Sequence, residues 1–354
     1  AAFDKMDRLF HEDGREPLSR TVFPIPVFSE TERRAQKAAL TQTKYAQPAI
    51  GTLSMGLYKI LREAGFKADF TAGHSFGELT ALWAAGVYDD DTFLALAKAR
   101  GEAMAATAGS DSGAMLAVKA PYEQVESTVQ SITGLTIANV NSPTQVVLGG
   151  SKAVIGEVET RLKSQGMTVI PLPVSAAFHT GFVEHAQQPF AQFVARQQFR
   201  TPAIPVYSNT TSKPYPEAPL AIKSILKGQI LKPVLFKDQI EQLYRAGGRL
   251  FVEFGPKGVL TNLVKDILGD QPHTAIALNP NGKQDSDKQF RLAVVQLRVL
   301  GLPLRNVDRY KKNSPRPAAK TKLNIAMGGH NYVSPQTQQA YIEALNDDFR
   351  ISGA

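Results

Sequence analysis

The amino-acid sequence predicts an α/β fold with a mainly parallel sheet, because short β-rich runs alternate along it with helical patterns. Four runs have the composition and length of strands, at residues 70–75, 203–209, 249–254 and 274–278. Four stretches carry apolar residues at helical spacing, near residues 47–65, 78–107, 181–197 and 236–246. Strands separated by helices pair in parallel, which is why we expect a parallel sheet.

Residues 112–176 follow a different pattern. The predicted elements there come in the order strand, helix, strand, strand, helix, strand, at 113–119, 122–132, 135–140, 145–150, 152–165 and 168–174. This βαββαβ order is that of a ferredoxin-like unit. We therefore expect a ferredoxin-like subdomain at 112–176, inserted into an α/β domain formed by 1–111 and 177–308.

Composition excludes several classes of protein. The chain has 354 residues, of which 43% are apolar and 20% charged, so it can bury a sizeable core. The absence of cysteine excludes disulfides, thiolate nucleophiles and cysteine-based metal sites. No apolar run approaches the roughly 20 residues that span a bilayer, and no secretory signal begins the sequence. We expect no membrane association and a cytoplasmic protein.

The net charge of +8 is concentrated in one place. Six Lys and Arg residues and no acid fall in 309–322, which predicts a basic linker followed by a tail within 309–354. Because no nucleic-acid-reading motif accompanies this charge, we expect an acidic protein partner and no nucleic acid. An apolar helical face begins at Ala2, which favours a domain cut from a longer polypeptide.

The strongest local signal is the G-x-S-x-G sequence centred on Ser75. It follows a predicted strand and precedes a predicted helix, which is the setting of a nucleophile elbow. Glycines at both flanks would let the backbone pack closely, and the N–H groups at the helix N-terminus would stabilise an oxyanion. The alternative is an ordinary capping box formed by Ser75 and Glu78.

A serine nucleophile needs a base, and His179 is the first of six candidates. It lies just past a predicted strand, where sites in α/β sheets gather. A packed core histidine is the alternative. His74 neighbours the serine, but adjacent side chains on an elbow point apart, so we expect His74 to line the site. No acid can be chosen as a third triad member.

Arg100 is an independent clue. On its predicted helix it is in phase with the apolar residues Phe93, Leu96 and Met104, so it should face inward. A guanidinium on a buried face needs an anion, which is either a protein carboxylate in a structural salt bridge or the carboxylate of a ligand.

Together these features resemble the malonyl-CoA:acyl carrier protein transacylase family, which includes the acyltransferase domains of polyketide and fatty-acid synthases. The resemblance runs from about residue 40 to 308. It rests on YAQPAI around Gln47, GHSFGE around Ser75, an arginine 25 positions later, NVNSPTQVV, AAFH at 176–179, LKPVLF at 231–236 and VEFGPKGVL at 252–260. The segment LNPNGKQDSDKQFRLAVVQLRVLGLPL further resembles polyunsaturated-fatty-acid synthases.

This resemblance implies an α/β-hydrolase-like domain with an inserted ferredoxin-like subdomain, and it implies residue roles. Ser75 would be the acylated nucleophile, His179 its base held by a backbone carbonyl, and Arg100 the clamp on the malonyl carboxylate. The Phe76 N–H would bind the oxyanion. The pocket residues it implies are Gln47, Phe178, His74 and Asn141, or Asn139 in place of Asn141. Phenylalanine at 178 accompanies malonyl selectivity in the family.

Substrate and partners follow from the same resemblance. Malonyl-CoA would be the acyl donor, the phosphopantetheine thiol of an acyl carrier protein the acceptor, and flanking synthase domains the neighbours. No metal or bound cofactor is implied. Two other functions stay open: a serine thioesterase or esterase, and a non-catalytic docking module of a synthase.

The sequence departs from the family at one point. In the family a GQGSQ loop after the first strand supplies a second oxyanion N–H, and the chain contains no such motif. Either the segment was cut away, or the chain is not fully active. Loss of one oxyanion donor typically lowers turnover by about a hundred- to a thousandfold.

Overall fold

A computed structural model describes residues 2–106, 112–307 and 334–346. The chain divides into two compact units, Ala1–Val307 and Asp308–Ala354. Within the second unit the described element is the helix α14 (Pro335–Asn346). The predicted basic linker at 309–322 lies outside the described residues.

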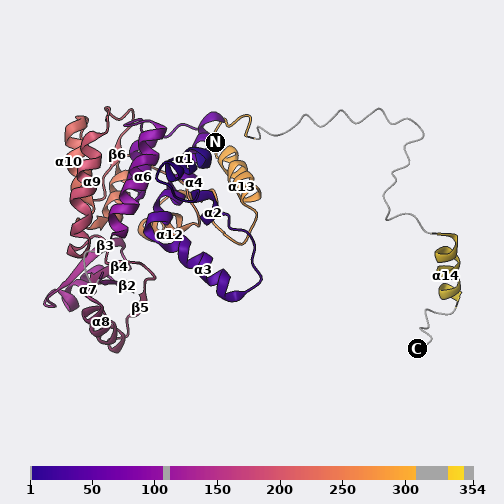
Figure 1. The fold of residues 1–354 in the computed structure, drawn as a ribbon, viewed down its shortest axis with the longest axis horizontal. Helices are drawn as coiled ribbons and strands as arrows, with labels where there is room; N and C mark the ends of the chain where they lie inside the picture. Colours follow the sequence, from indigo (N-terminus) through magenta and orange to yellow (C-terminus); the bar gives the residue numbers. More distant parts are fainter. Residues whose placement is uncertain (1, 107–111, 308–333, 347–354) are drawn as a thin grey trace. The chain divides into compact units, whose positions relative to one another are not determined.

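The first unit alternates helices and short strands (Figure 1). Its helices are α1 (Ala2–Glu12), α2 (Leu18–Val22), α3 (Glu30–Thr41), α4 (Thr43–Glu63), α5 (Gly77–Ala84), α6 (Asp90–Ala105), α7 (Tyr122–Val129), α8 (Lys152–Ser164), η1 (Gly181–Val183), α9 (Glu184–Arg196), α10 (Pro219–Gln229), α11 (Phe236–Arg245), α12 (Val259–Leu268) and α13 (Ser286–Val299). Its strands are β1 (Thr71–Ala72), β2 (Ala114–Lys119), β3 (Leu135–Ser142), β4 (Gln145–Gly150), β5 (Thr168–Pro171), β6 (Val206–Tyr207), β7 (Val234–Leu235), β8 (Leu250–Glu253) and β9 (Thr274–Ala277).

The predicted parallel strands exist, but they form two separate pairs. Strand β1 pairs in parallel with β6, and β8 pairs in parallel with β9. Among the described residues no strand joins the two pairs into the single sheet that the sequence predicted. The parallel part of the α/β fold is therefore built in two halves.

Besides the two parallel pairs, the first unit contains a five-stranded mixed sheet. Its order is β5-β2-β4-β3-β7; the pairs β5–β2, β2–β4 and β4–β3 are antiparallel, and the pair β3–β7 is parallel. The order of the first four strands is ferredoxin-like, and α7 and α8 contribute to a common core with them. The fold class predicted from the sequence is confirmed. The limits 112–176 of the inserted subdomain stay a prediction. Strand β7, which lies outside that range, also joins the sheet.

Helix α6 crosses the centre of the main core between α4 and α9 (Figure 1). Its inward stripe includes Phe93 and Leu96, both fully buried, and Arg100 is in phase with them as the sequence predicted. Gly101 allows α4 to approach, because a Cβ there would lie 2.9 Å from the Thr43 carbonyl oxygen. This close packing brings Gln47 of α4 next to Arg100 of α6.

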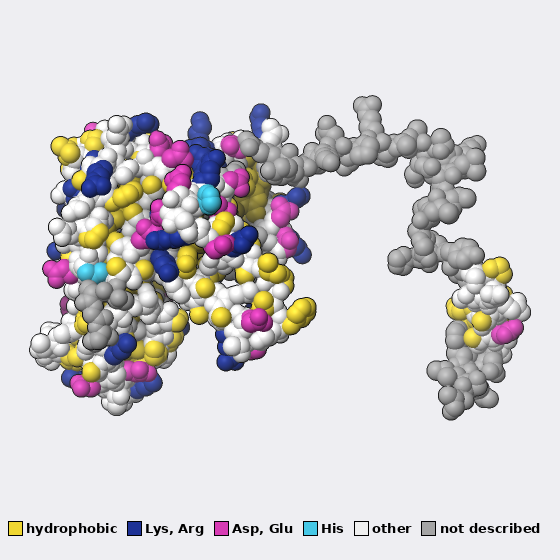
Figure 2. Space-filling model, viewed as in Figure 1, with side chains coloured by type: hydrophobic (Ala, Val, Ile, Leu, Met, Phe, Trp, Pro, Cys, Tyr) yellow, Lys and Arg dark blue, Asp and Glu magenta, His cyan; other side chains and the backbone are white. Residues whose placement is uncertain are grey.

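Charged side chains of both signs are interspersed over the face of the molecule in Figure 2. Several pair across elements, such as Lys5 with Asp91 at 2.7 Å and Arg15 with Glu102 at 2.6 Å. Such exposed pairs contribute little stability, about 0–1 kcal/mol each.

Among the described helices, none is both long and apolar enough to cross a bilayer.

Candidate active site

Ser75 occupies the tight turn between β1 and α5. Its backbone φ is 51°, in the left-handed region that residues other than glycine adopt rarely. A Cβ on Gly73 would lie 2.0 Å from the carbonyl carbon of Gly77, so only glycine lets this turn close onto the helix. A Cβ on Gly77 would meet nothing within 4 Å, so the close packing predicted at both glycines occurs at Gly73 alone. A strained turn between strand and helix is the geometry of a nucleophile elbow.

The side chains around this turn do not form a capping box. The Ser75 N–H donates to Oδ1 of Asn209 at 2.6 Å, and the Glu78 carboxylate accepts from the Tyr215 hydroxyl at 2.6 Å. The Asn209 amide also donates to the Gly73 carbonyl at 2.6 Å. Asn209 therefore bonds to the residues on both sides of the turn and holds its left-handed conformation.

Ser75 and His179 lie in hydrogen-bond contact, although 104 positions separate them. The Ser75 Oγ is 2.6 Å from Nε2 of His179. The other ring nitrogen, Nδ1, faces the backbone carbonyls of Lys232 at 2.9 Å and Gln229 at 3.3 Å. Since carbonyls can only accept, we assign the proton to Nδ1, which leaves the Nε2 lone pair to accept the serine proton.

His179 is almost fully buried, and its environment keeps it neutral. Burial, together with the charge of Arg100 and the electrostatic effect of His74, lowers its pKa to about 3. A neutral imidazole is the form that removes a proton from a hydroxyl. The orientation comes from backbone carbonyls, which explains why no acid could be identified from the sequence.

Arg100 places its guanidinium beside this pair. Its Nη1 donates to Oε1 of Gln47 at 2.7 Å, and Nη2 donates to Oε1 of Gln229 at 3.1 Å and approaches the Ser75 Oγ at 3.4 Å. The side chain is 1% exposed, and its Nε has no hydrogen-bond partner. Burial lowers its pKa to about 10, while the charge of Glu78 opposes this shift.

The structural salt bridge considered for Arg100 is not found. Among the described residues no carboxylate lies within 4 Å of the guanidinium, and both contacts at its ends are amide oxygens. The buried cation thus keeps an Nε–H without a partner, and its Nη2 lies 3.4 Å from the Ser75 Oγ. This arrangement suits the carboxylate of a ligand.

Gln229 connects the separate parts of the site. Its amide nitrogen donates to the Ser75 carbonyl at 2.8 Å and to Oε2 of Glu78 at 2.9 Å, while its amide oxygen accepts from Arg100. Glu78 is completely buried, and burial raises its pKa. The amide of Gln229 therefore lies between a buried carboxylate and a buried guanidinium and keeps them from pairing directly.

The sequence interpretation missed the roles of Gln229, Asn209 and Glu78. Gln229 follows Ile222 and Leu226 at helical spacing, the same signal that singled out Arg100. Asn209 lies at the carboxyl end of a strand, where the rule that drew attention to His179 applies equally. Glu78 was considered only as a helix cap, and nothing in the sequence indicates its contact with Tyr215.

His74 and the implied asparagines lie together beside the turn. The Nε2 of His74 is 2.8 Å from Oδ1 of Asn141, and burial lowers the pKa of His74. Asn139 is buried two residues earlier on the same strand, and the pairing of β3 with β4 is irregular between Val140 and Ser142, at Asn141. The Asn141 side chain bonds to His74 and Gln145 and not to Ser75.

Phe178 and Phe76 flank the reacting pair. Phe178 is half-buried and contacts apolar residues of both the main core and the five-stranded sheet. The backbone N–H groups of Gly77 and Glu78 bond back within the turn. The Phe76 N–H has no partner among the described residues, so it is available to an oxyanion.

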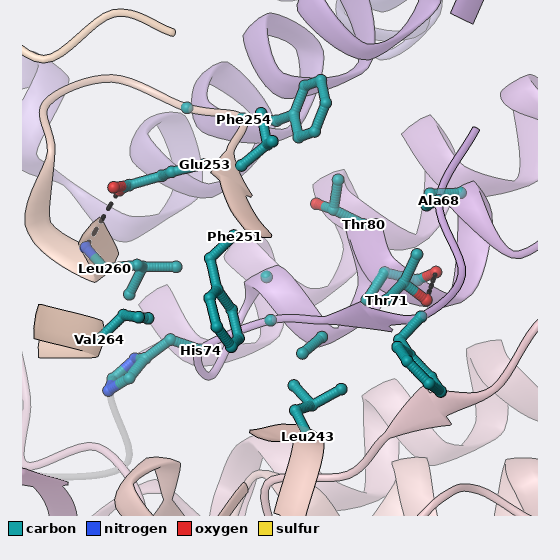
Figure 3. A pocket seen from close by; sticks show the side chains of 18 of the residues that line it. Ala68, Thr71, His74, Thr80, Leu243, Phe251, Glu253, Phe254, Leu260 and Val264 are labelled. Atoms are coloured by element: carbon teal, nitrogen blue, oxygen red, sulfur yellow. Dashed lines mark hydrogen bonds between the residues drawn. The ribbon is translucent and has the colours of Figure 1, made fainter. Parts of the chain in front are cut away.

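A cavity of about 580 Å³ lies beside the turn that carries Ser75, and Figure 3 shows side chains that line it. Its lining includes Gly73, His74 and Phe76, but not Ser75, His179 or the guanidinium of Arg100. The reacting pair is thus not inside this cavity.

No group of three or more His, Asp or Glu side chains in the described part of the chain is placed to hold a metal ion.

Comparison with protein families identifies the fold and chemistry. The acyl transferase domain family matches residues 27–302, well over half of the chain.

The chain belongs to the acyl transferase domain family.

Individual relatives of this acyltransferase chain fall into two groups. It is 33% identical over 346 residues to a polyunsaturated fatty acid synthase component of Thraustochytrium sp., a match that covers 95% of this chain and 12% of that protein. It is 34% identical over 237 residues to a malonyl CoA-acyl carrier protein transacylase of Synechocystis sp., covering 67% of this chain and 79% of the relative. The family resemblance inferred from the sequence is therefore confirmed.

Solved structures share the fold. The acyltransferase domain from the second module of the salinomycin polyketide synthase superimposes with a TM-score of 0.76 at 29% identity, covering 90% of this chain and 72% of that one. The acyl-carrier-protein-S-malonyltransferase of Bartonella henselae superimposes with a TM-score of 0.72 at 27% identity, covering 85% and 90%. These neighbours agree with the α/β architecture described above.

Proposed function

We propose that this acyltransferase chain transfers a malonyl group from malonyl-CoA to the phosphopantetheine thiol of an acyl carrier protein, through an ester on Ser75. The observation that carries the proposal is Arg100, a buried guanidinium without a carboxylate partner among the described residues, 3.4 Å from the Ser75 hydroxyl. A malonyl group has one carboxylate to bind and one thioester carbonyl to react. The site offers one group for each.

In the first half-reaction Ser75 becomes acylated. His179 Nε2 accepts the hydroxyl proton while Oγ attacks the thioester carbonyl, and the resulting oxyanion accepts a hydrogen bond from the Phe76 N–H. When the C–S bond breaks, His179 returns the proton to the departing coenzyme A thiolate. Arg100 holds the free malonyl carboxylate throughout, which fixes the reacting carbonyl near Oγ.

The second half-reaction reverses these roles with a different thiol. The carrier's phosphopantetheine thiol gives its proton to His179 and attacks the Ser75 ester. The C–O bond breaks and Ser75 recovers the proton. Coenzyme A and the carrier are substrates here, and no step of this sequence uses a metal or bound cofactor.

The names and lengths of the relatives support the proposed partners. The names of the transacylase and malonyltransferase relatives include an acyl carrier protein, and the synthase relative is far longer than this chain, which supports a carrier and flanking synthase domains as neighbours. The cytoplasmic location expected from the sequence stays a prediction.

The acceptor of the acyl group, a thiol or water, distinguishes the proposed acyltransferase from a thioesterase or esterase. We would incubate the chain with malonyl-CoA, remove the excess, and add either pantetheine or buffer. We expect the acyl group to move to pantetheine much faster than to water. Rapid release to water would favour a thioesterase or esterase, and a chain that never becomes acylated would favour a docking module.

A further inference from the structure

Gln229, the last residue of α10, contacts all three of the residues that the proposed mechanism uses most. Its backbone carbonyl lies 3.3 Å from Nδ1 of His179. Its amide nitrogen donates to the Ser75 carbonyl at 2.8 Å, and its amide oxygen accepts from Arg100 at 3.1 Å. The side chain is 1% exposed and takes no part in the proposed proton transfers, so its buried amide needs a different explanation.

A buried charge lies on each side of this amide. Glu78 accepts from the Gln229 amide nitrogen at 2.9 Å, and it also accepts from a neutral donor, the Tyr215 hydroxyl, at 2.6 Å. Arg100 donates to the amide oxygens of Gln229 and Gln47. Glu78 is completely buried, and Arg100 is 1% exposed. Two opposite charges in the interior are thus separated by the amide group of Gln229.

The separation is unusual because opposite charges attract strongly in a protein interior and are normally found paired there. Burial lowers the pKa of Arg100, and the charge of Glu78 opposes this shift, so the two groups already act on each other. A direct ion pair with Glu78 would use the Nη2 donor that now lies 3.4 Å from the Ser75 Oγ. The guanidinium would then have fewer donors for the carboxylate of a substrate.

We propose that Gln229 is a positioning residue for acyl selectivity: its amide occupies the space between Glu78 and Arg100, prevents their ion pair, and so keeps the guanidinium available to the carboxylate of the acyl donor. A neutral amide suits this position because its oxygen accepts from the cation while its nitrogen donates to the anion. An apolar side chain would satisfy neither charge. The inference deepens the proposed function and rests on it for the carboxylate that Arg100 binds.

The side chain can be tested separately from the backbone of Gln229. Nδ1 of His179 also faces the Lys232 carbonyl, at 2.9 Å, so the orientation of the base does not depend on Gln229 alone. A substitution that disturbed the base would slow the transfer of every acyl group. A substitution that released Arg100 to Glu78 would slow only acyl groups that carry a carboxylate. The ratio of the rates with malonyl-CoA and acetyl-CoA therefore distinguishes the two effects.

Gln229→Ala, with and without Glu78→Gln, tests the role of the amide. In Gln229→Ala the guanidinium can turn to Glu78, and we expect the preference for malonyl over acetyl to fall about tenfold, as it does when about a tenth of the molecules are competent to bind. The loss should appear in the KM of malonyl-CoA and not in the acylation rate at saturation. Adding Glu78→Gln removes the competing charge and should restore the preference. Gln289→Ala, which removes another buried glutamine bonded to the backbone of Asn281, should keep it.

A crystal structure of Gln229→Ala tests the inference without acyl transfer. We expect a carboxylate oxygen of Glu78 within about 4 Å of an Arg100 Nη atom, the range of an ion pair. The role of Gln229 would be overturned if the two charges stayed apart in this variant, if the variant kept its malonyl preference, or if Glu78→Gln failed to restore a lost one. A chain that takes up no malonyl group before mutation would contradict the proposed function instead, and the crystal structure would still decide whether the amide separates the charges.

Discussion

The five-stranded sheet and the two parallel pairs of this molecule differ in how completely their strands are covered. In the five-stranded sheet β2 and β4 have neighbours on both sides, and most of their residues are buried. In the parallel pairs β1 and β8 each have one neighbour and are half-buried throughout. We call the five-stranded sheet closed and the parallel pairs open, because β1 and β8 each have one edge without a strand partner among the described residues.

The reacting residues are divided between these two regions. His179 and Phe178 follow β5, and the segment is fixed to the closed sheet by the Leu172 N–H bonded to the Met115 carbonyl and by the Ala177 N–H bonded to Ser112. Ser75 follows β1, at the open sheet, and its turn depends on the Asn209 amide. The base and the nucleophile are thus positioned by different parts of the molecule.

The largest effect is expected at the base, His179, whose segment is bonded to the five-stranded sheet. His179→Ala should slow acylation of Ser75 by at least about a hundredfold, the usual contribution of a general base. Stopped-flow or quenched acylation by malonyl-CoA measures the rate. His273→Ala, which removes an outlying histidine, should leave it unchanged, and a near-normal rate for His179→Ala would assign the base to another residue.

Arg100→Ala tests the proposed clamp on the malonyl carboxylate. Loss of a charge-assisted pair worth about 1.5–3 kcal/mol should reduce the preference for malonyl over acetyl by roughly ten- to 150-fold. Competitive acylation with the two thioesters gives the ratio. Lys98→Ala removes a cation from the same helix outside the site and should keep the preference. If Arg100→Ala keeps it too, Arg100 has a structural role only.

Phe178→Ser probes the acyl pocket beside the base. A branched methylmalonyl group would displace the Phe178 ring at a cost of about 1–3 kcal/mol, which corresponds to a five- to 150-fold preference for malonyl. The serine variant should narrow this ratio, as read from the masses of the acyl-enzymes in competition. Phe182→Ser, a change at another half-buried ring nearby, should not. Equal labelling of the unmutated chain would contradict a selective role.

The smallest effect is expected from acidity. The pKa of His179 is lowered to about 3 from its ordinary 6.5, so the imidazole stays neutral where a free histidine takes up a proton. Protonation of His179 would block proton transfer from Ser75, but it does not occur between about pH 7.5 and 5.5. The acylation rate should therefore change less than about twofold over that range. A rate that halves near pH 6.5 would show an ordinary, solvent-like histidine.

Local patterns in the sequence predicted much of the site. The elbow at Ser75, the inward phase of Arg100 and the position of His179 after a strand each depend on a few neighbouring residues. The contacts of Gln229 and Asn209 depend on segments more than 100 positions away from Ser75, which no local pattern reveals.

Contacts between segments far apart in the sequence also limit the prediction of the fold. Strand composition predicted β1, β6, β8 and β9, but pairing is decided by long-range packing, so the division into two pairs could not be foreseen. The addition of β7 to the ferredoxin-like strands is likewise a contact between distant segments.

The central claim is that Ser75 carries the acyl group, and intact mass spectrometry tests it most directly. The chain and its Ser75→Ala variant would each be incubated with malonyl-CoA, freed of excess reagent and weighed. We expect the unmutated chain to gain the mass of one malonyl group and the variant, which loses a single oxygen atom and keeps its fold by circular dichroism, to gain none. A stable malonyl adduct on Ser75→Ala, or no adduct on the unmutated chain, would contradict the account.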